Sequence, residues 1–148
     1  MTGDDMGASV SIGDVDLDGY GDILTGAPGE DITRSGVNES SAGQVFLIRG
    51  SATGPTGTGA VGYSQGTTGI PGATEPDDRL GSSVSLTDLS GYSRADIAIG
   101  ADGEDANGTI VQIDNTSTSG IKPDTGLYYG VSALGSSTGI RIGLTPAP

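Results

Sequence analysis

The chain contains an internal repeat with an offset of 74 residues. Residues 6–31 read MGASVSIGDVDLDGYGDILTGAPGED, and residues 80–105 read LGSSVSLTDLSGYSRADIAIGADGED. The two segments align without a gap, and the identical positions include Val, Ile, Asp and Glu as well as small residues. Chance or low complexity does not place such different residue types in the same order twice. We therefore expect each segment to form one copy of a repeated structural unit.

Composition alone leaves two classes of chain open. The 148 residues include 28 Gly and 7 Pro, and 19 Asp and Glu stand against 6 Lys and Arg, for a net charge of -13. Such a balance is compatible with a Gly-rich all-β domain or with a solvated acidic tail. The repeat favours the domain, because the glycines recur at fixed positions instead of being scattered along the chain.

Several functional classes are excluded by residue types that the sequence lacks. The chain has no His and no Cys, so it has no imidazole base, no thiol nucleophile, no disulfide and no zinc ligand of either kind. We therefore expect no enzymatic activity in this chain. The acidic balance argues against nucleic acid or an anionic membrane as a partner, and no apolar run reaches the roughly 18 residues of a membrane span.

Each unit is expected to contain four short strands. In the first unit these strands are Gly7–Ile12, Asp22–Gly26, Gln44–Arg49 and a weaker one around Ala60–Gln65. The first alternates small or apolar residues with serines, and the third is rich in β-branched and aromatic residues. No stretch of helical period interrupts them. The sequence thus predicts an all-β protein made of four-stranded antiparallel units, the form of a β-propeller blade.

The order of motifs in each unit resembles the FG-GAP repeat. Met6-Gly7 precedes an Asp-rich loop and then an apolar run into Gly26-Ala27-Pro28, and in the second unit Leu80-Gly81 and Gly100-Ala101-Asp102 take the corresponding places. The FG-GAP repeat builds the β-propeller of integrin α-subunits and of many secreted bacterial proteins. The resemblance implies that 1–148 is a partial propeller with about two blades. It places the first blade with a calcium loop at 6–66, the second with a degenerate calcium loop at 80–131, and the first strand of a following blade at 139–148.

The number of blades sets this chain apart from a complete propeller. Propellers usually close with about 4–8 blades, whereas this chain supplies about two blades and one further strand. The further strand is indicated by the similarity of Arg141-Ile142-Gly143 to Arg79-Leu80-Gly81. Three interpretations remain open: a fragment of a larger propeller, several copies that assemble into a closed ring or stacked dimer, and an open two-blade monomer.

The segment from residue 14 to residue 22 predicts a metal site. It places carboxylates at loop positions 1, 3, 5 and 9 and Gly at position 6, which is similar to the opening half of an EF-hand loop. A plain turn needs only one Asp and one Gly. All-oxygen ligands select a hard cation, and several flexible carboxylates favour Ca²⁺ over Mg²⁺. The predicted calcium ligands are Asp14, Asp16, Asp18, Asp22 and the backbone carbonyl of Tyr20.

The corresponding loop of the second unit, Asp88 to Asp96, has lost two carboxylates. Ser90 and Tyr92 occupy positions 3 and 5, and fewer charges lower calcium affinity. We expect this loop to be metal-free, with Arg94 placed to neutralise Asp88 or Asp96.

The resemblance implies a calcium-stabilised extracellular β-propeller module that serves binding, adhesion or scaffolding. Loops such as Gly50–Gly59 and Ile70–Asp78 would be displayed to a protein or carbohydrate ligand. The segment Met1–Asp5 lacks the features of a signal peptide. If the natural protein is secreted, we expect its signal to lie outside this chain. Two alternatives remain: an accessory propeller domain of a secreted hydrolase whose catalytic residues lie outside this chain, and a self-assembling two-blade fragment. The expected partners are therefore an unidentified ligand and either further copies of the chain or the remaining blades of a larger propeller.

Overall fold

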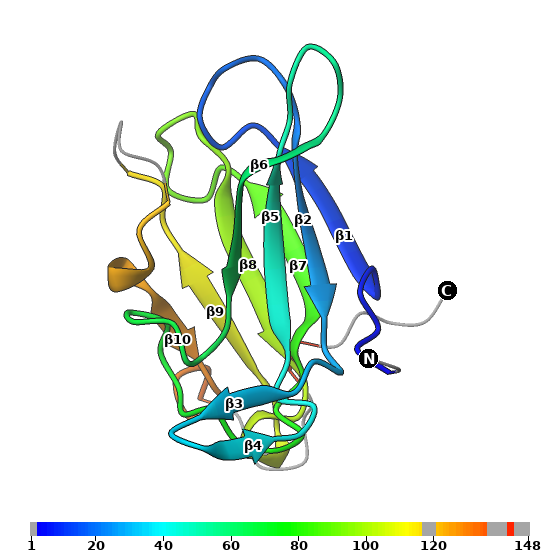
Figure 1. The fold of residues 1–148 in the computed structure, drawn as a ribbon. Helices are drawn as coiled ribbons and strands as arrows, with labels where there is room; N and C mark the ends of the chain where they lie inside the picture. Colours follow the sequence, from blue (N-terminus) through cyan, green and yellow to red (C-terminus); the bar gives the residue numbers. More distant parts are fainter. Residues whose placement is uncertain (1–2, 117–120, 136–141, 144–148) are drawn as a thin grey trace.

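The computed structural model describes residues 3–116, 121–135 and 142–143, and it consists of two four-stranded antiparallel sheets that face each other (Figure 1). The first sheet has the order β1-β2-β5-β6, and the second has the order β10-β9-β8-β7. This arrangement confirms the predicted all-β fold of four-stranded antiparallel units. The strands of the first sheet are β1 (Ser9–Gly13), β2 (Asp22–Ala27), β5 (Gln44–Arg49) and β6 (Thr56–Tyr63). Those of the second sheet are β7 (Leu80–Thr87), β8 (Asp96–Ala101), β9 (Thr109–Ile113) and β10 (Leu127–Tyr129).

The observed strand boundaries differ from the predicted ones mainly in the fourth strand. β5 coincides with the predicted third strand, whereas β6 begins at Thr56, four residues before the predicted start. Thr56 pairs with Arg49 beyond an irregularity in the β5–β6 register. The prediction of a loop at Gly50–Gly59 is therefore wrong for residues 56–59, which belong to β6.

A short hairpin that the sequence analysis did not predict follows β2. It consists of β3 (Ile32–Arg34) and β4 (Val37–Glu39), and it lies at the end of the sheets opposite the β1–β2 loop (Figure 1). Ser35 and Gly36 form its turn with φ values of 52° and 82°, the two left-handed positions of a type I′ turn. The Ser-Gly dipeptide between two short runs with β-branched residues was the available signal.

Helical structure in the described residues is limited to two 3₁₀ turns, η1 (Glu104–Ala106) and η2 (Pro123–Thr125). Neither is long or apolar enough to cross a membrane.

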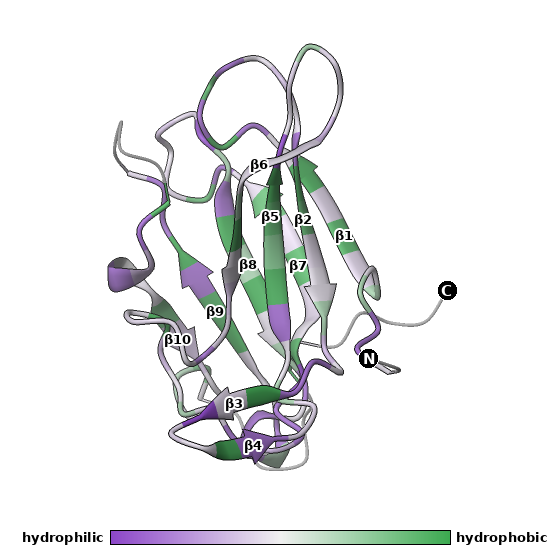
Figure 2. Ribbon diagram, in the orientation of Figure 1, coloured by the Kyte–Doolittle hydropathy of each residue, from purple (hydrophilic) through white to green (hydrophobic). Residues whose placement is uncertain are grey.

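The hydrophobic core lies between the two sheets. Successive side chains of a strand point to opposite faces, and the buried apolar residues of β2, β5, β7, β8 and β9 form one cluster in this layer. Figure 2 shows apolar residues along these strands. The first sheet contributes chiefly Leu24, Val45 and Leu47, and the second contributes Leu86, Ile97, Ile99, Val111 and Ile113. The two units are thus packed face to face and share one core.

The second unit begins directly on the first sheet. The N–H of Leu80 donates to the carbonyl of Ala42 at 3.0 Å, and the hydroxyl of Ser9 donates to the carbonyl of Gly81 at 2.8 Å. Gly26 leaves room for this approach, because a Cβ there would overlap with the carbonyl oxygen of Gly81. The Leu80-Gly81 motif is therefore a docking point between units.

Ile142 and Gly143 dock on the second sheet in the same way. The N–H of Ile142 donates to the carbonyl of Asn107 at 2.8 Å, and the hydroxyl of Ser83 donates to the carbonyl of Gly143 at 2.8 Å. These are the counterparts of the contacts made by Leu80 and Gly81. The rest of the strand predicted at 139–148 lies outside the described residues.

Candidate metal centre

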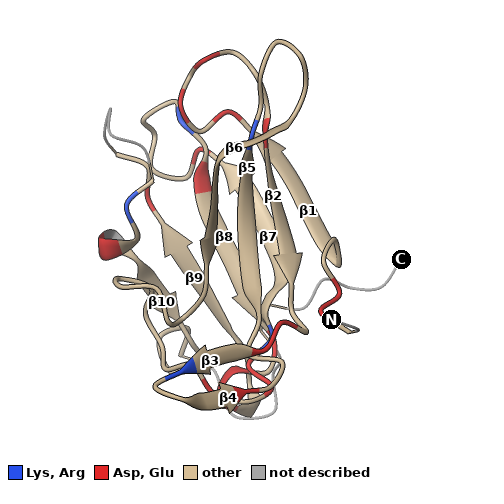
Figure 3. Ribbon diagram, in the orientation of Figure 1, with Lys and Arg blue, Asp and Glu red and all other residues tan. Residues whose placement is uncertain are grey.

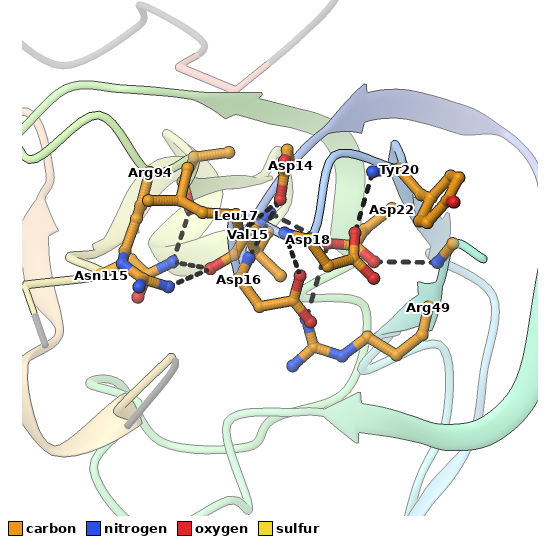
Figure 4. A network of polar contacts seen from close by, with 12 residues as sticks. Asp14, Val15, Asp16, Leu17, Asp18, Tyr20, Asp22, Arg49, Arg94 and Asn115 are labelled. Carbon is orange, nitrogen blue, oxygen red and sulfur yellow. Dashed lines mark hydrogen bonds and ion pairs between the residues drawn. The ribbon is translucent and has the colours of Figure 1, made fainter. Parts of the chain in front are cut away.

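Three carboxylates converge in the segment 14–22, which joins β1 to β2 and which we call the Asp loop. Asp14, Asp16 and Asp18 each place one carboxylate oxygen within 4.8 Å of those of the other two (Figure 4). Asp14 is half-buried, and Asp16 and Asp18 are exposed. Alternate residues of the loop therefore point toward one centre, as the spacing of the sequence predicts.

Backbone N–H groups of the same loop support these carboxylates. The carboxylate of Asp14 accepts from the N–H of Leu17 at 2.6 Å and from that of Gly19 at 3.0 Å. Asp18 accepts from the N–H of Tyr20 at 2.8 Å. Leu17 and Gly19 have φ values of 63° and 87°, so the loop turns sharply at two points. Tyr20 contributes to the loop through its backbone, and its side chain is exposed.

Asp22 lies apart from the three converging carboxylates. Its side chain is only 1% exposed, and it accepts from the N–H of Val15 and from that of Gly50, each at 2.9 Å. Gly50 follows β5, so Asp22 joins the beginning of the Asp loop to the beginning of the β5–β6 connection. The geometry gives Asp22 an anchoring role, and its assignment as a calcium ligand stays a prediction.

Arg49 is a site residue that the sequence analysis missed. Its Nη1 lies 3.5 Å from Asp16 Oδ2 and 3.5 Å from Asp22 Oδ2 (Figure 4). This nitrogen is buried and makes no hydrogen bond. The Asp loop therefore does have a basic neighbour. Arg49 could have been found from the pairing of the second and third strands. Ile48 pairs with Ile23, and this register brings the end of β5 beside the start of β2.

The loop between β7 and β8 repeats the backbone of the Asp loop without its central carboxylates. Asp88 accepts from the N–H groups of Gly91 at 2.6 Å and Ser93 at 2.9 Å, the same spacing that Asp14 uses. Gly91 and Ser93 have φ values of 80° and 62°. Ser90 occupies a ligand position but donates its hydroxyl to Asp96 at 3.1 Å. This loop therefore has the backbone shape of the Asp loop but two fewer carboxylates.

Asp96 is the counterpart of Asp22. It is fully buried and accepts from the N–H groups of Leu89 at 2.7 Å, Ser90 at 2.7 Å and Asn115 at 2.6 Å. Asn115 takes the place that Gly50 has in the first unit. The last Asp of each loop therefore holds its loop against the segment that follows the third strand of the same sheet.

The two loops also contact each other. The N–H of Ala95 donates to the carbonyl of Asp14 at 3.0 Å, and the side-chain amide of Asn115 donates to the carbonyl of Val15 at 2.6 Å (Figure 4). Arg94 Nη1 lies 3.4 Å from the same carbonyl. Among the ion pairs of the described residues, none joins Arg94 to Asp88 or Asp96. Arg94 therefore connects the two loops rather than neutralising its own.

Acidic residues gather at both ends of the sheets, in the loops at the top of Figure 3 and around the β3–β4 hairpin at the bottom. At the lower end, Asp78 and Glu104 are 3% and 4% exposed. Burial raises the pKa of Asp78 to about 7, assisted by the charges of Glu104 and other neighbouring carboxylates. Burial likewise raises the pKa of Glu104, which accepts a hydrogen bond from the side-chain amide of Gln65. The sequence suggested that Ile70–Asp78 is a displayed loop, but both its ends, Ile70 and Asp78, are buried.

The donor set of the Asp loop suits a hard cation. All of its side-chain ligands are carboxylate oxygens, and two of its three residues are open to solvent, so an ion has both ligands and access. Among the described residues, this is the one group of three acidic side chains with converging oxygens.

Residues 6–48 match a family model described as FG-GAP repeat. The matched segment contains β1, the Asp loop, β2, the β3–β4 hairpin and nearly all of β5. No similar protein was found among the curated proteins.

Proposed function

We propose that this chain is an extracellular β-propeller module that binds calcium and serves binding or scaffolding. The proposal starts from the match of residues 6–48 to the FG-GAP repeat. The observation that carries the calcium proposal is the convergence of Asp14, Asp16 and Asp18, with one oxygen of each within 4.8 Å of the others. The predicted set is completed by the carbonyl of Tyr20 and by Asp22.

Calcium would supply the charge that the loop lacks. Two carboxylates about 6 Å apart repel by roughly 3 kcal/mol at an effective dielectric near 20. Arg49 offsets part of this repulsion at Asp16, but no cationic side chain pairs with Asp14 or Asp18 among the described ion pairs. A divalent ion at the centre would relieve the repulsion of all three at once. Its effect is to order the loop and, through Asp22 and Asp14, the contacts that the loop makes with β5 and with the second unit.

The expected affinity matches an extracellular setting. Calcium sites of extracellular modules have dissociation constants of about 10⁻⁴–10⁻³ M. At about 1 mM free calcium such a site adds about 0.4–1.4 kcal/mol to the free energy of unfolding. The FG-GAP family is commonly extracellular, and calcium is abundant there.

The module is proposed to act by contact and not by chemistry. The chain has neither His nor Cys, so it lacks an imidazole base and a thiol nucleophile. Its sheets instead hold connections such as 50–55 and 71–77, whose residues are exposed or half-buried, where a protein or carbohydrate ligand would meet them.

A pair of loop variants tests calcium binding. The melting temperature of the wild type in 1 mM free Ca²⁺ should exceed that in EGTA by about 1–4 °C. The double variant Asp16→Asn, Asp18→Asn should lose this difference. The matched control is Asp88→Asn, which removes a carboxylate from the loop of the same shape in the second unit and should keep the difference.

A direct binding measurement completes the test. Terbium is a luminescent substitute for calcium that a nearby tyrosine sensitises, and Tyr20 lies in the Asp loop. Terbium luminescence that calcium displaces, and that disappears in the double variant, is expected. Melting curves that are identical with calcium and EGTA, together with no displaceable terbium signal, would contradict the calcium proposal.

A further inference from the structure

Two sheet faces of the described structure point away from the shared core. We call the outer face of the first sheet the donor face; it contains Val10, Ile12, Ile23, Phe46 and Ile48. We call the outer face of the second sheet the acceptor face; it contains Ser83, Ser85, Ala98, Gly100 and Ile110. Neither set contains a charged residue. Both faces lie on the same molecule, on its two opposite sides.

The donor face is chemically the same surface that the second unit buries. With the offset of 74 residues, Val10 corresponds to Val84, Ile12 to Leu86 and Ile23 to Ile97. Leu86 and Ile97 belong to the core, and Val84 packs against it. On the first sheet the same positions are open, with Val10 56% and Ile12 66% exposed. Both belong to β1, which carries apolar residues along its length (Figure 2). Within the described part of the chain they form an exposed apolar surface.

The acceptor face is the counterpart of the surface that receives the second unit. Ser83, Ser85 and Gly100 correspond to Ser9, Ser11 and Gly26. On the first sheet, Ser11 accepts from the N–H of Leu86 at 2.9 Å, and Ser9 and Gly26 meet Gly81. On the second sheet this surface holds a shallow, mostly apolar hollow of about 230 Å³, lined by Ser83, Val84, Ser85, Ala98, Ile99, Gly100 and Ile110.

The acceptor face already holds the beginning of a further unit. Ile142 and Gly143 repeat, on Asn107 and Ser83, the hydrogen bonds that Leu80 and Gly81 make on Ala42 and Ser9. Gly108 and Gly100 leave the room for this approach, since a Cβ on either would meet the carbonyl oxygen of Ile142 or Gly143. The second sheet therefore accepts an incoming unit in the register that the first sheet uses.

We infer that a second copy of this chain docks its donor face onto the acceptor face, head to tail, and that the contact reproduces the packing between the two units within one chain. The same molecule carries both halves of this contact, which favours another copy over an unrelated partner. The contact joins different surfaces of the two copies, so it is heterologous. Repetition of such a contact gives either a closed ring or an open filament. The 148 residues contribute two units, so a ring of about 4–8 blades built from copies of this segment would contain two to four of them.

Two features weaken this contact relative to the packing within one chain. Ile142 and Gly143 occupy the place that Met6 and Gly7 of the incoming copy would take, so the two segments compete. Thr87 stands where the first sheet has Gly13, whose missing Cβ makes room for Leu86 and Ala95. Self-association is therefore expected at micromolar protein concentrations. Loosening the contact of Ile142 and Gly143 with the acceptor face should raise the affinity between copies. The inference rests on the repeat and the sheet packing, and not on calcium.

The test uses the full chain and charges placed on each face. Sedimentation velocity of the wild type from about 2 to about 200 μM should show a rise in mass. Ile12→Asp removes the donor face, Ala98→Asp removes the acceptor face, and each variant alone should stay monomeric. Val37→Asp on β4 places the same charge at an apolar residue that is 56% exposed but on neither face, so it should associate like the wild type. Circular dichroism shows whether each variant keeps its β structure.

Mixing the two variants distinguishes head-to-tail contact from any symmetric one. The Ile12→Asp chain retains its acceptor face and the Ala98→Asp chain retains its donor face, so an equimolar mixture should form dimers and nothing larger. Ile142→Asp, which loosens the competing segment, should lower the dissociation constant of the otherwise wild-type chain. A wild type that stays monomeric at about 200 μM, or two folded variants whose mixture forms no dimer, overturns the inference. Either result leaves the calcium measurements above unaffected, because those are made on the Asp loop.

Discussion

The hydroxyl of Ser9 donates to the carbonyl of Gly81 at 2.8 Å, across 72 residues of sequence. This bond lies where the start of the second unit meets the first sheet, and Gly26 stands directly beside it. The contact between the units thus depends on this hydrogen bond and on Gly26. A Cβ atom at Gly26 would push the two units apart.

Replacing Gly26 by Ala should separate the units. The added Cβ would overlap with the backbone carbonyl of Gly81, which cannot rotate away as a side chain could. We expect a loss of about 2 kcal/mol or more in the free energy of unfolding, measured by urea denaturation. Gly57→Ala is the control, because its Cβ would meet nothing within 4 Å. Equal stability of the two variants would show that the packing at Gly26 adapts.

Asp22→Ala should be far more damaging than Asp16→Ala when both are measured in EGTA. Asp22 is buried and accepts from the N–H groups of Val15 and Gly50, so its loss leaves these two donors without their acceptor. It also removes one of the two carboxylates beside the buried end of Arg49. We expect a cost of about 3 kcal/mol for Asp22→Ala and less than about 0.5 kcal/mol for the exposed Asp16. Comparable urea midpoints would argue against the anchoring role of Asp22.

Arg49→Gln should tighten calcium binding while lowering stability without calcium. The guanidinium lies 3.5 Å from Asp16 Oδ2, so it repels an incoming cation. Without calcium it neutralises part of the negative charge of the loop. Removing about 1 kcal/mol of repulsion corresponds to roughly a fivefold lower dissociation constant, measurable by isothermal titration calorimetry. Arg34→Gln on β3, at the other end of the sheets, should leave the calcium affinity unchanged. A weaker affinity in Arg49→Gln would mean that Arg49 positions the ligands instead of competing with the ion.

Asp78 should make the protein less stable as the pH rises from about 4 to about 7. Its pKa is about 7 in the folded chain, against 3.8 as the ordinary value, so the folded state retains a proton that the unfolded state releases. Between these values the unfolded state binds fewer protons, and the free energy of unfolding therefore falls with rising pH until about pH 7. Burial is the main cause, and the N–H of Glu75, which donates to Asp78 at 2.7 Å, opposes it.

The variant Asp78→Asn isolates this effect. It should match the wild type near pH 4 and be more stable than the wild type at pH 8, measured as the difference in melting temperature at each pH. Asp124→Asn, an exposed residue of η2, is the control for the general loss of one negative charge. A difference between Asp78→Asn and wild type that does not change with pH would refute the assignment.

Much of the fold was predictable because strand formation follows local patterns. The alternation in Gly7–Ile12 predicted a strand that the structure has at Ser9–Gly13. The β-branched run in Gln44–Arg49 predicted a strand that the structure has with the same bounds. The hairpin at Ile32–Arg34 and Val37–Glu39 was missed, because three-residue strands carry too little periodicity to be recognised and only the Ser-Gly turn marks them.

The candidate site was predictable in part for the same reason. Asp14, Asp16 and Asp18 converge because they are neighbours in one loop, so their spacing contains the geometry. Arg49 and Gly50 reach that loop from 27 or more residues away, and only the pairing of β2 with β5 brings them there.

The order of residues alone settles that this chain is a repeat of small four-stranded units with an acidic loop in the first, because repetition, alternation and loop spacing are local properties. Which face of each sheet becomes buried is a different matter. Val10 and Val84 are the same residue in the same position of two copies, yet Val84 packs against the core and Val10 is 56% exposed. The difference arises only when the second sheet covers one side of the first and leaves the other open. The ion pairs of Arg49 depend in the same way on the pairing of β2 with β5, and the raised pKa of Asp78 depends on the segments that bury it. Each of these properties is set by residues that are distant in the sequence.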